Sequence, residues 1–292
     1  MNLRLLKSFL VVGQCGSVTK AADILHISQP ALTRQIQDLE DMYGCKLFER
    51  SKKGLTMTAS GYLLEVRAQE MLSLAERTKH EMLASGGFVG GIVRVGCVET
   101  SAAEWLASKL ALLPEKYPQM QFEVYSADGD DIRALLDEDR LDLGLLLEPV
   151  ETAKYDSFVL PVTERWGVVV RSDSEFAQQD EITRKALASI PLILPRRHIV
   201  LDSLQAWFGD MSDKIRVAGY HNIPTNGLLL VKQNLGALLC VEGSITIREH
   251  DDYKFVSIIP EKVSNQRMVR KRARKLSTAA ENFWNLCQLD LA

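Results

Sequence analysis

Residues 17–43 carry two short helical patterns separated by a tight turn, and no other feature of the chain limits the fold as strongly. Ser17 can cap a first helix that runs to Leu25, and Ser28 can cap a second, because a serine hydroxyl accepts a hydrogen bond from an N–H of the first turn. Pro30 falls in the first turn of the second helix, where a missing N–H costs no hydrogen bond. Apolar residues recur along that helix at the spacing of one buried face: Leu32, Ile36 and Leu39. The pattern predicts either a helix-turn-helix or an ordinary helical hairpin with polar residues facing solvent.

The exposed edge at the start of the second helix carries side chains that suit base recognition. Gln29, Thr33 and Arg34 lie there. The second helix of a helix-turn-helix places its first residues at base edges in the major groove. Glutamine can make two hydrogen bonds to adenine, arginine can make two to guanine, and the threonine methyl can contact thymine. These three residues are therefore candidates for contacts with bases.

A basic segment follows the two helices. Arg50, Lys52 and Lys53 precede a glycine turn and a short extended run over residues 55–57. A basic hairpin beside a recognition helix is typical of a wing, which holds phosphate or enters the minor groove. Residues 1–60 contain eight basic and five acidic residues, whereas the whole chain has a net charge of −3. A basic N-terminal segment on an acidic body suits a local phosphate-binding surface.

The N-terminal region resembles the LysR-type transcriptional regulators in three stretches, NLRLLKSFLVV, GSVTKAADILHISQPALTRQIQDLE and KLFERSKKGLTMTASG. One departure is Ala59, where the family usually has Glu or Pro. The change loses a favourable charge at a helix N-terminus and leaves the fold unaffected. The resemblance implies a winged helix-turn-helix domain over residues 1–57. It also implies a set of DNA-facing residues: Ser28, Gln29, Pro30, Thr33 and Arg34 in the helix, and Arg50, Lys52 and Lys53 in the wing.

The pattern of residues 58–87 predicts one long, uninterrupted linker helix, and Thr58 can cap its N-terminus. Residues spaced alternately four and three apart form a heptad seam: Leu64, Ala68, Met71, Ala75, Thr78 and Met82. Such a seam is typical of a helix that pairs with a partner helix, so we expect a homodimer that binds two DNA half-sites. The alternative is that the stripe packs on the chain's own body. By resemblance to the family, such dimers can pair again into a homotetramer.

Strand-like and helix-like segments alternate over residues 88–292. The expected buried strands are residues 92–98, 122–125 and 141–147, and a second set of strands is expected at residues 167–171, 191–194, 215–220 and 237–241. This alternation predicts mainly parallel sheets with helices on both faces. The resemblance implies an α/β effector domain of two lobes, similar to periplasmic solute-binding proteins, with crossovers at residues 159–163 and 263–268. The expected lobes are residues 91–161 with 267–292, and residues 162–266.

Ligands of such sheets lie beyond the carboxyl ends of the strands. Residues 100 and 101 follow the first strand and begin a helix, whose free N–H groups suit an anion, and the resemblance also places effector contacts there. Residue 126 follows the second strand, and residues 195–200, with two arginines and a histidine, follow a strand of the second lobe. The candidate effector contacts are Thr100, Ser101, Ser126, Arg196 and His198. They predict a small-molecule effector, with a carboxylate-bearing anion as the favoured class. The alternative is that the hydroxyls only cap a helix and the arginines are solvated.

Other classes of function fit the sequence less well. An α/β enzyme would need a phosphate loop after a strand, whereas the glycines of residues 86–91 precede one. No zinc motif or nucleophile elbow occurs either, so we expect no catalytic residue, no cofactor and no metal. A solute-binding transport protein would need an export signal and would leave the N-terminal helices unexplained. No apolar run is long enough to cross a bilayer, and we therefore expect a cytoplasmic protein.

Two further features have open interpretations. The five cysteines are scattered along the chain, which predicts small buried hydrophobes and leaves a redox role open. The basic run over residues 267–275 is expected to be a solvated strand edge that discourages pairing, with a second DNA-binding patch as the alternative.

Overall fold

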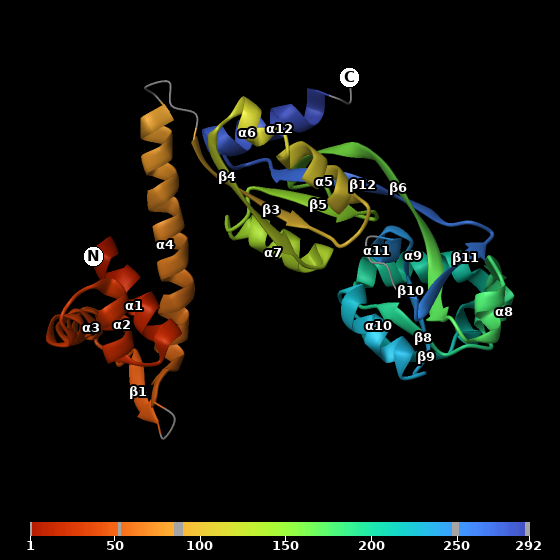
Figure 1. Cartoon of the computed structure of the whole chain (residues 1–292), viewed down its shortest axis with the longest axis horizontal. Coiled ribbons are helices and arrows are strands. Elements are labelled where there is room, and N and C mark those ends of the chain that lie inside the picture. Colours follow the sequence, from red (N-terminus) through yellow and green to blue (C-terminus); the bar gives the residue numbers. More distant parts are fainter. Residues whose placement is uncertain (1, 52–53, 85–89, 247–250, 290–292) are drawn as a thin grey trace. The chain divides into compact units, whose positions relative to one another are not determined.

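The computed structural model describes residues 2–51, 54–84, 90–246 and 251–289, and it separates into two compact units, Met1–Gly86 and Gly87–Ala292 (Figure 1). The first unit is helical with a small hairpin. Its elements are α1 (Leu3–Cys15), α2 (Val18–Leu25), α3 (Gln29–Tyr43), β1 (Phe48–Ser51), β2 (Gly54–Met57) and α4 (Ala59–Ala84).

Helices α2 and α3 form the predicted helix-turn-helix, and both predicted caps are present. The Ser17 hydroxyl accepts a hydrogen bond from the Lys20 N–H at 3.4 Å, and the Ser28 hydroxyl accepts one from the Ala31 N–H at 3.4 Å. His26 ends α2 with φ of 53°, a left-handed conformation that stops a helix within one residue. The turn is therefore set by local interactions within the chain.

The core of this unit corrects the prediction for the long helix. Leu64 and Ala68 pack with Phe9 and Leu39 in the unit's own core, and Met71 packs against them. The first half of the expected seam therefore does not face a partner helix. The exposed apolar residues of α4 lie elsewhere on the helix: Tyr62, Leu63, Val66, Leu74 and Met82. Of the expected seam, only Met82 is among them.

A buried carboxylate joins α3 to the start of the hairpin. Glu40 is 7% exposed and accepts hydrogen bonds from the Lys46 ammonium, from the Leu47 N–H at 2.9 Å and from the Phe48 N–H at 3.4 Å. Burial alone would raise the pKa of Glu40, but these hydrogen bonds lower it below its usual value. The hairpin is thus fixed to α3 by a charged group that remains ionised.

The second unit contains two sheets. The first sheet has the order β4-β3-β5-β12-β6, with β3 parallel to both β4 and β5. Its elements are β3 (Gly90–Cys97), α5 (Ala102–Leu110), α6 (Leu113–Lys116), β4 (Gln119–Ser126), α7 (Gly129–Asp137), β5 (Leu143–Leu147), β6 (Tyr155–Arg171), β12 (Val263–Lys271) and α12 (Thr278–Gln288). Helices α5 and α12 cover one face, and α7 lies on the other (Figure 1).

The second sheet has the order β6-β10-β8-β9, with β11 on the other side of β6 and β7 beside β11. Its elements are η1 (Glu175–Gln178), β7 (Glu181–Thr183), α8 (Arg184–Leu187), β8 (Leu192–Pro195), α9 (His198–Phe208), η2 (Gly209–Lys214), β9 (Val217–His221), α10 (Pro224–Lys232), β10 (Ala237–Val241), α11 (Gly243–Thr246) and β11 (Tyr253–Ile259). Strands β8, β9 and β10 are parallel. Helices α9 and α10 pack in separate apolar clusters.

Strands β6 and β12 connect the two sheets. They pair antiparallel, with Thr163 opposite Asn265 and Val159 opposite Arg267, and β6 belongs to both sheets. The expected crossover segments, residues 159–163 and 263–268, lie within these two strands.

Two predictions for this unit were wrong. The strand over residues 119–126 is a sheet edge with exposed Phe122, Val124 and Tyr125, not a buried strand. The basic run begins in β12, which is an inner strand between β5 and β6, so it is no solvated edge. Its cations instead pair with the chain's own carboxylates: Arg267 with Glu148, Arg270 with Glu281, and Arg274 with Asp142.

Candidate functional site

Helix α3 presents a polar face opposite its buried residues. Gln29 and Thr33 are one helical turn apart, and so are Pro30 and Arg34, so the four residues form two neighbouring rows. Gln29, Pro30 and Arg34 are exposed, and Thr33 is half-buried. The hydroxyl of Ser28 caps the helix, so this residue stands at the same end with its oxygen directed to the backbone. The row of Gln29 and Thr33 and the row of Pro30 and Arg34 are accessible to another molecule.

The predicted wing is an antiparallel hairpin of β1 and β2, in which Arg50 pairs with Leu55. Arg50 therefore lies near the tip of the hairpin on strand β1. Lys52 and Lys53, the other predicted wing contacts, lie outside the described residues.

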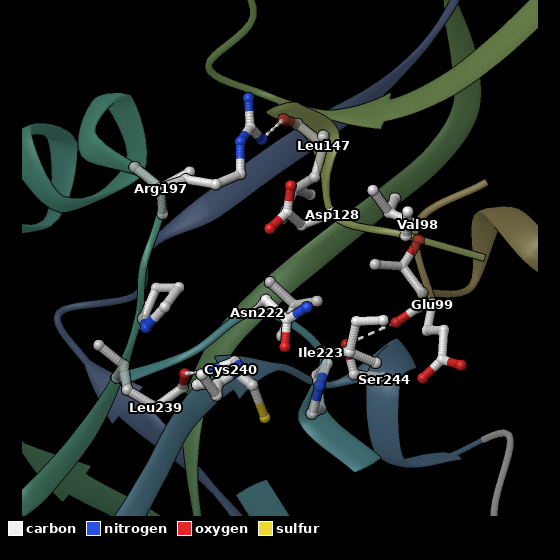
Figure 2. A pocket seen from close by; sticks show the side chains of 18 of the residues that line it. Val98, Glu99, Asp128, Leu147, Arg197, Asn222, Ile223, Leu239, Cys240 and Ser244 are labelled. Carbon is white, nitrogen blue, oxygen red and sulfur yellow. Dashed lines mark hydrogen bonds between the residues drawn. The ribbon is translucent and has the colours of Figure 1, made fainter. Parts of the chain in front are cut away.

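A cleft lies at the carboxyl ends of the parallel strands of both sheets (Figure 2). Residues that follow β3, β4 and β5 face residues that follow β8, β9 and β10, as expected for ligand sites of parallel sheets. The lining is mostly apolar and includes Trp166, Val200 and Leu239. Its polar members are Glu99, Thr100, Asp128, Arg197, His221, Asn222 and Ser244.

Of the five expected effector contacts, Thr100 alone belongs to this lining. Thr100 is buried, and its hydroxyl accepts a hydrogen bond from the Gln266 amide at 2.7 Å. Ser126 is exposed at the end of the edge strand β4, and His198 is exposed at the first position of α9. The structure therefore places Thr100 in the lining of the cleft and the other four residues outside it, and the effector contacts stay a prediction.

Ser101 is held by a carboxylate of the same chain. Glu164, on the crossover strand β6, is 2% exposed. It accepts hydrogen bonds from the Ser101 N–H at 2.7 Å, from the Ser101 hydroxyl, and from the Gly243 N–H at 2.9 Å. A Cβ atom on Gly243 would lie 2.4 Å from a Glu164 oxygen, so only glycine allows this approach. The N–H donor at the start of α5 that suggested an anionic ligand is therefore already bonded to an anion of the protein.

The arginines of residues 195–200 are likewise paired, and neither is simply solvated. Arg196 pairs with Asp128 at 2.7 Å and with Asp131 at 2.9 Å. Arg197 is 7% exposed and pairs with Asp130 at 3.1 Å. These ion pairs join the start of α9 in one lobe to the start of α7 in the other.

Two cleft residues that we did not select have polar atoms without a partner among the described residues. These atoms are Nη2 of Arg197 and Nδ1 of His221, and both are buried. Burial lowers the pKa of His221, although the nearby Leu239 carbonyl opposes the shift. His221 is the last residue of β9, and Arg197 comes two residues after Pro195, the last residue of β8. Because ligands lie at the carboxyl ends of such strands, the sequence could have indicated Arg197 and His221 as candidates. It does not indicate which of several neighbouring side chains faces the cleft.

The cysteines are free among the described residues. Burial, together with the nearby Glu99 carboxylate, raises the pKa of Cys97 to about 12. Burial, together with Glu164, also raises the pKa of the Cys240 thiol, which lines the cleft. Because the thiolate is the reactive form, both cysteines are stable thiols at neutral pH.

We expect Cys97 and Cys240 of the native full-length chain to react with iodoacetamide at pH 7.5 at least about a hundredfold more slowly than the same residues in urea. Cys15 and Cys45, which are only partly buried, provide the internal comparison in the native state. Mass spectrometry of the labelled peptides measures all four rates. Native labelling of Cys240 as fast as that of Cys15 would contradict the assignment.

Together, the two units define a class of protein. A winged helix-turn-helix combined with a two-lobed α/β unit that has a cleft at its strand ends is the architecture of a transcriptional regulator that responds to a small molecule. The family model for bacterial regulatory helix-turn-helix proteins of the lysR family matches residues 3–62, and the model for the LysR substrate binding domain matches residues 86–291. The chain belongs to the LysR family of transcriptional regulators.

Individual relatives agree with this assignment. The chain is 23% identical to the transcriptional regulator YfeR of Shigella flexneri, over 98% of this chain and 92% of that protein. It is 30% identical to BsdA of Bacillus subtilis (strain 168), over 67% of each chain. The crystal structure of full-length CbnR complexed with its target DNA has the same fold, with a TM-score of 0.77, 22% identity and 99% of both chains covered.

No helix in the described part of the chain is long and apolar enough to span a membrane. The described residues also contain no group of three or more His, Cys, Asp or Glu residues that could hold a metal ion.

Proposed function

We propose that this protein binds double-stranded promoter DNA through α3 and the wing, and that a small-molecule effector in the cleft modulates this binding. Residues 1–57 form the DNA-binding domain, residues 58–87 the linker and dimerisation helix, and residues 88–292 the effector domain. The observation that carries the proposal is the exposed polar face of α3, which is the second helix of a helix-turn-helix.

The DNA contacts divide into two kinds. Gln29, Thr33 and Arg34 contact base edges in the major groove, with Ser28 and Pro30 at the same end of the helix. Arg50, Lys52 and Lys53 hold the phosphate backbone or enter the minor groove. The same architecture in CbnR, which was solved with its target DNA, supports this arrangement.

The protein acts as a homodimer that can pair again into a homotetramer. The support is the exposed apolar set of α4, in which Leu63, Val66 and Leu74 are available to a partner helix. Two-fold symmetry places two recognition helices on two half-sites.

The effector shifts the equilibrium between arrangements of the two lobes and thereby changes how the oligomer holds DNA. The effector domain binds its ligand and does not transform it. Because the partner is promoter DNA, the protein acts in the cytoplasm.

Replacement of the proposed base-contacting residues tests the DNA site. We expect Gln29→Ala and Arg34→Ala each to weaken binding to the promoter beside the protein's own gene by about five- to a hundredfold, because each loses a bidentate base contact. A mobility-shift assay measures the loss. Arg216→Ala removes an exposed arginine of the effector domain and should leave binding unchanged. Binding by both test variants equal to that of the native protein would refute the assignment of α3.

A further inference from the structure

Five charged residues join the two lobes at one edge of the cleft. Arg196 follows β8 in the second lobe, and its guanidinium pairs with Asp128 at 2.7 Å and with Asp131 at 2.9 Å. Arg197, the next residue, pairs with Asp130 at 3.1 Å. The three aspartates lie at the start of α7 in the first lobe. Each of these ion pairs therefore crosses from one lobe to the other.

The fold restricts the positions of these charges. Asp128 is 5% exposed, and one of its carboxylate oxygens accepts hydrogen bonds from two N–H groups in the first turn of α7 at 3.0 Å each. Its other oxygen accepts from Arg196 at 2.7 Å. Arg197 is buried as well, and a Cβ on Gly129 would lie 2.6 Å from its guanidinium carbon, so the close approach depends on glycine. Groups held in this way lose less conformational entropy on pairing than two long side chains on a free surface.

The strands that connect the lobes have an irregular ladder where they pass from one sheet to the other. Thr163 is opposite Asn265 and Val159 is opposite Arg267, so residues 160–162 of β6 lie opposite residue 266 of β12. Such a bulge interrupts the ladder and bends the strand locally. Residue 161 is a proline, which has no N–H to donate. A few residues of the crossover strands can therefore take up a change in the arrangement of the lobes, as in a hinge.

Hydrogen bonds join the lobes at a second place. Thr225 of α10 donates to the Glu99 carboxylate at 2.9 Å, and Ser244 of α11 donates to the Glu99 carbonyl oxygen at 2.8 Å. Figure 2 shows Ser244 beside Glu99 and apart from Arg197. Because both donors are uncharged hydroxyls, salt screens these contacts far less than it screens the ion pairs. Changes of charge or salt therefore act selectively on the ion pairs.

We propose that the five charged residues form an electrostatic latch that stabilises the closed arrangement of the lobes, in which the starts of α7 and α9 meet. The latch consists of Arg196 and Arg197 with Asp128, Asp130 and Asp131. Bending of the crossover strands opens it. A partly exposed ion pair contributes little by itself, so open and closed arrangements can be close in free energy, as a switch requires. This inference rests on the proposed function only in taking the lobe arrangement as the property that an effector changes.

A distance between spin labels on α7 and α9 measures the state of the latch. Ala134 of α7 and Ala206 of α9 are exposed, and both are replaced by cysteine and labelled in the full-length protein. The partly buried Cys15 and Cys45 are replaced by serine to avoid additional labels. Labelled chains are mixed with an excess of unlabelled chains, so that the distances from pulsed electron paramagnetic resonance lie within one chain.

Charge reversal and its rescue identify the ion pairs. We expect Arg196→Glu to lengthen the mean label distance by more than about 2 Å, because it places a carboxylate opposite Asp128 and Asp131. Addition of Asp131→Arg restores a pair of opposite charges and should recover about half of this shift or more. Arg171→Glu is the matched control, because it makes the same change of charge within the second lobe, where Arg171 pairs with Asp173. It should leave the distance unchanged.

The latch of the chain without charge reversal should respond to salt, so the test does not depend on the folding of a variant. The Arg196 and Asp131 side chains are 49% and 47% exposed, and the Debye length falls from about 10 Å at 0.1 M to about 3 Å at 1 M ionic strength. The label distance should therefore lengthen between these two concentrations of sodium chloride. A distance constant within about 1 Å in every variant and at both concentrations would overturn the proposal, and so would equal shifts in Arg171→Glu and Arg196→Glu. If the native protein bound no promoter DNA while the distances changed as expected, the DNA proposal would fall and the latch would stand.

Discussion

Replacement of Glu164 by alanine is expected to lower the free energy of unfolding of the effector domain by about 2–6 kcal/mol. The carboxylate is 2% exposed and accepts from the Ser101 N–H and the Gly243 N–H. Its removal leaves both backbone donors buried without an acceptor. Each orphaned donor costs about 1–3 kcal/mol, more than the hydrogen bond itself contributes.

The four tryptophans allow this loss to be measured in the effector domain alone. All of them lie in the second unit: Trp105, Trp166, Trp207 and Trp284. Urea unfolding followed by tryptophan fluorescence therefore reports on this unit without interference from the DNA-binding unit.

A small carboxylate should restore part of the lost stability. The Glu164→Ala variant leaves space beside two N–H donors, and acetate can bind there in the folded state only, which stabilises that state by mass action. Sodium chloride at the same concentration controls for ionic strength. Glu164→Gln fills the space with an amide, so it should be destabilised without a response to acetate. The free energy of unfolding is measured in acetate and in sodium chloride for the native protein, Glu164→Ala and Glu164→Gln. The proposed role of Glu164 as an anion bound by the backbone would be contradicted if Glu164→Ala were as stable as the native protein, or if acetate stabilised all three proteins equally.

Glu164 also shows which parts of the site the sequence could predict. The caps Ser17 and Ser28 bond to residues three positions away, so the helix-turn-helix follows from local pattern. Glu164 binds donors that are 63 and 79 positions away. No local pattern connects such residues, and the free donors predicted at Thr100 and Ser101 were therefore assigned to an external anion.

The long helix was predicted and is present as α4, but what its apolar stripe packs against was not predicted, for a related reason. The heptad spacing from Leu64 to Met82 identifies an apolar stripe, but it does not identify what the stripe packs against. In the structure Leu64 and Ala68 pack on α1 and α3 of the same chain. The expected strands 92–98, 191–194 and 237–241 correspond to β3, β8 and β10, because the alternation of strands and helices is a local pattern. The choice between Arg196 and Arg197 depends on side-chain direction, which the aspartates at the start of α7 determine.

Replacement of Gly61 by alanine is expected to unfold the DNA-binding unit or to destabilise it by about 3 kcal/mol or more, and thereby to abolish DNA binding. Gly61 is buried in the first turn of α4, against the segment that leads into the hairpin. A Cβ atom there would lie 2.3 Å from the Leu47 carbonyl oxygen and 3.1 Å from the Met57 Cβ. The Leu47 carbonyl is backbone and already accepts the Thr58 N–H at 3.0 Å. Relief of the clash therefore requires α4 to move away from the hairpin.

Far-UV circular dichroism and the mobility-shift assay measure the result, and tryptophan fluorescence checks that the effector domain remains folded. Gly219→Ala is the matched control, because a Cβ at this position of β9 meets no atom within 4 Å. The control should unfold and bind DNA as the native protein does. DNA binding of Gly61→Ala within about twofold of the native level would show that the helix and hairpin tolerate separation. In that case the close contact between α4 and the hairpin would not be needed to hold the wing beside α3.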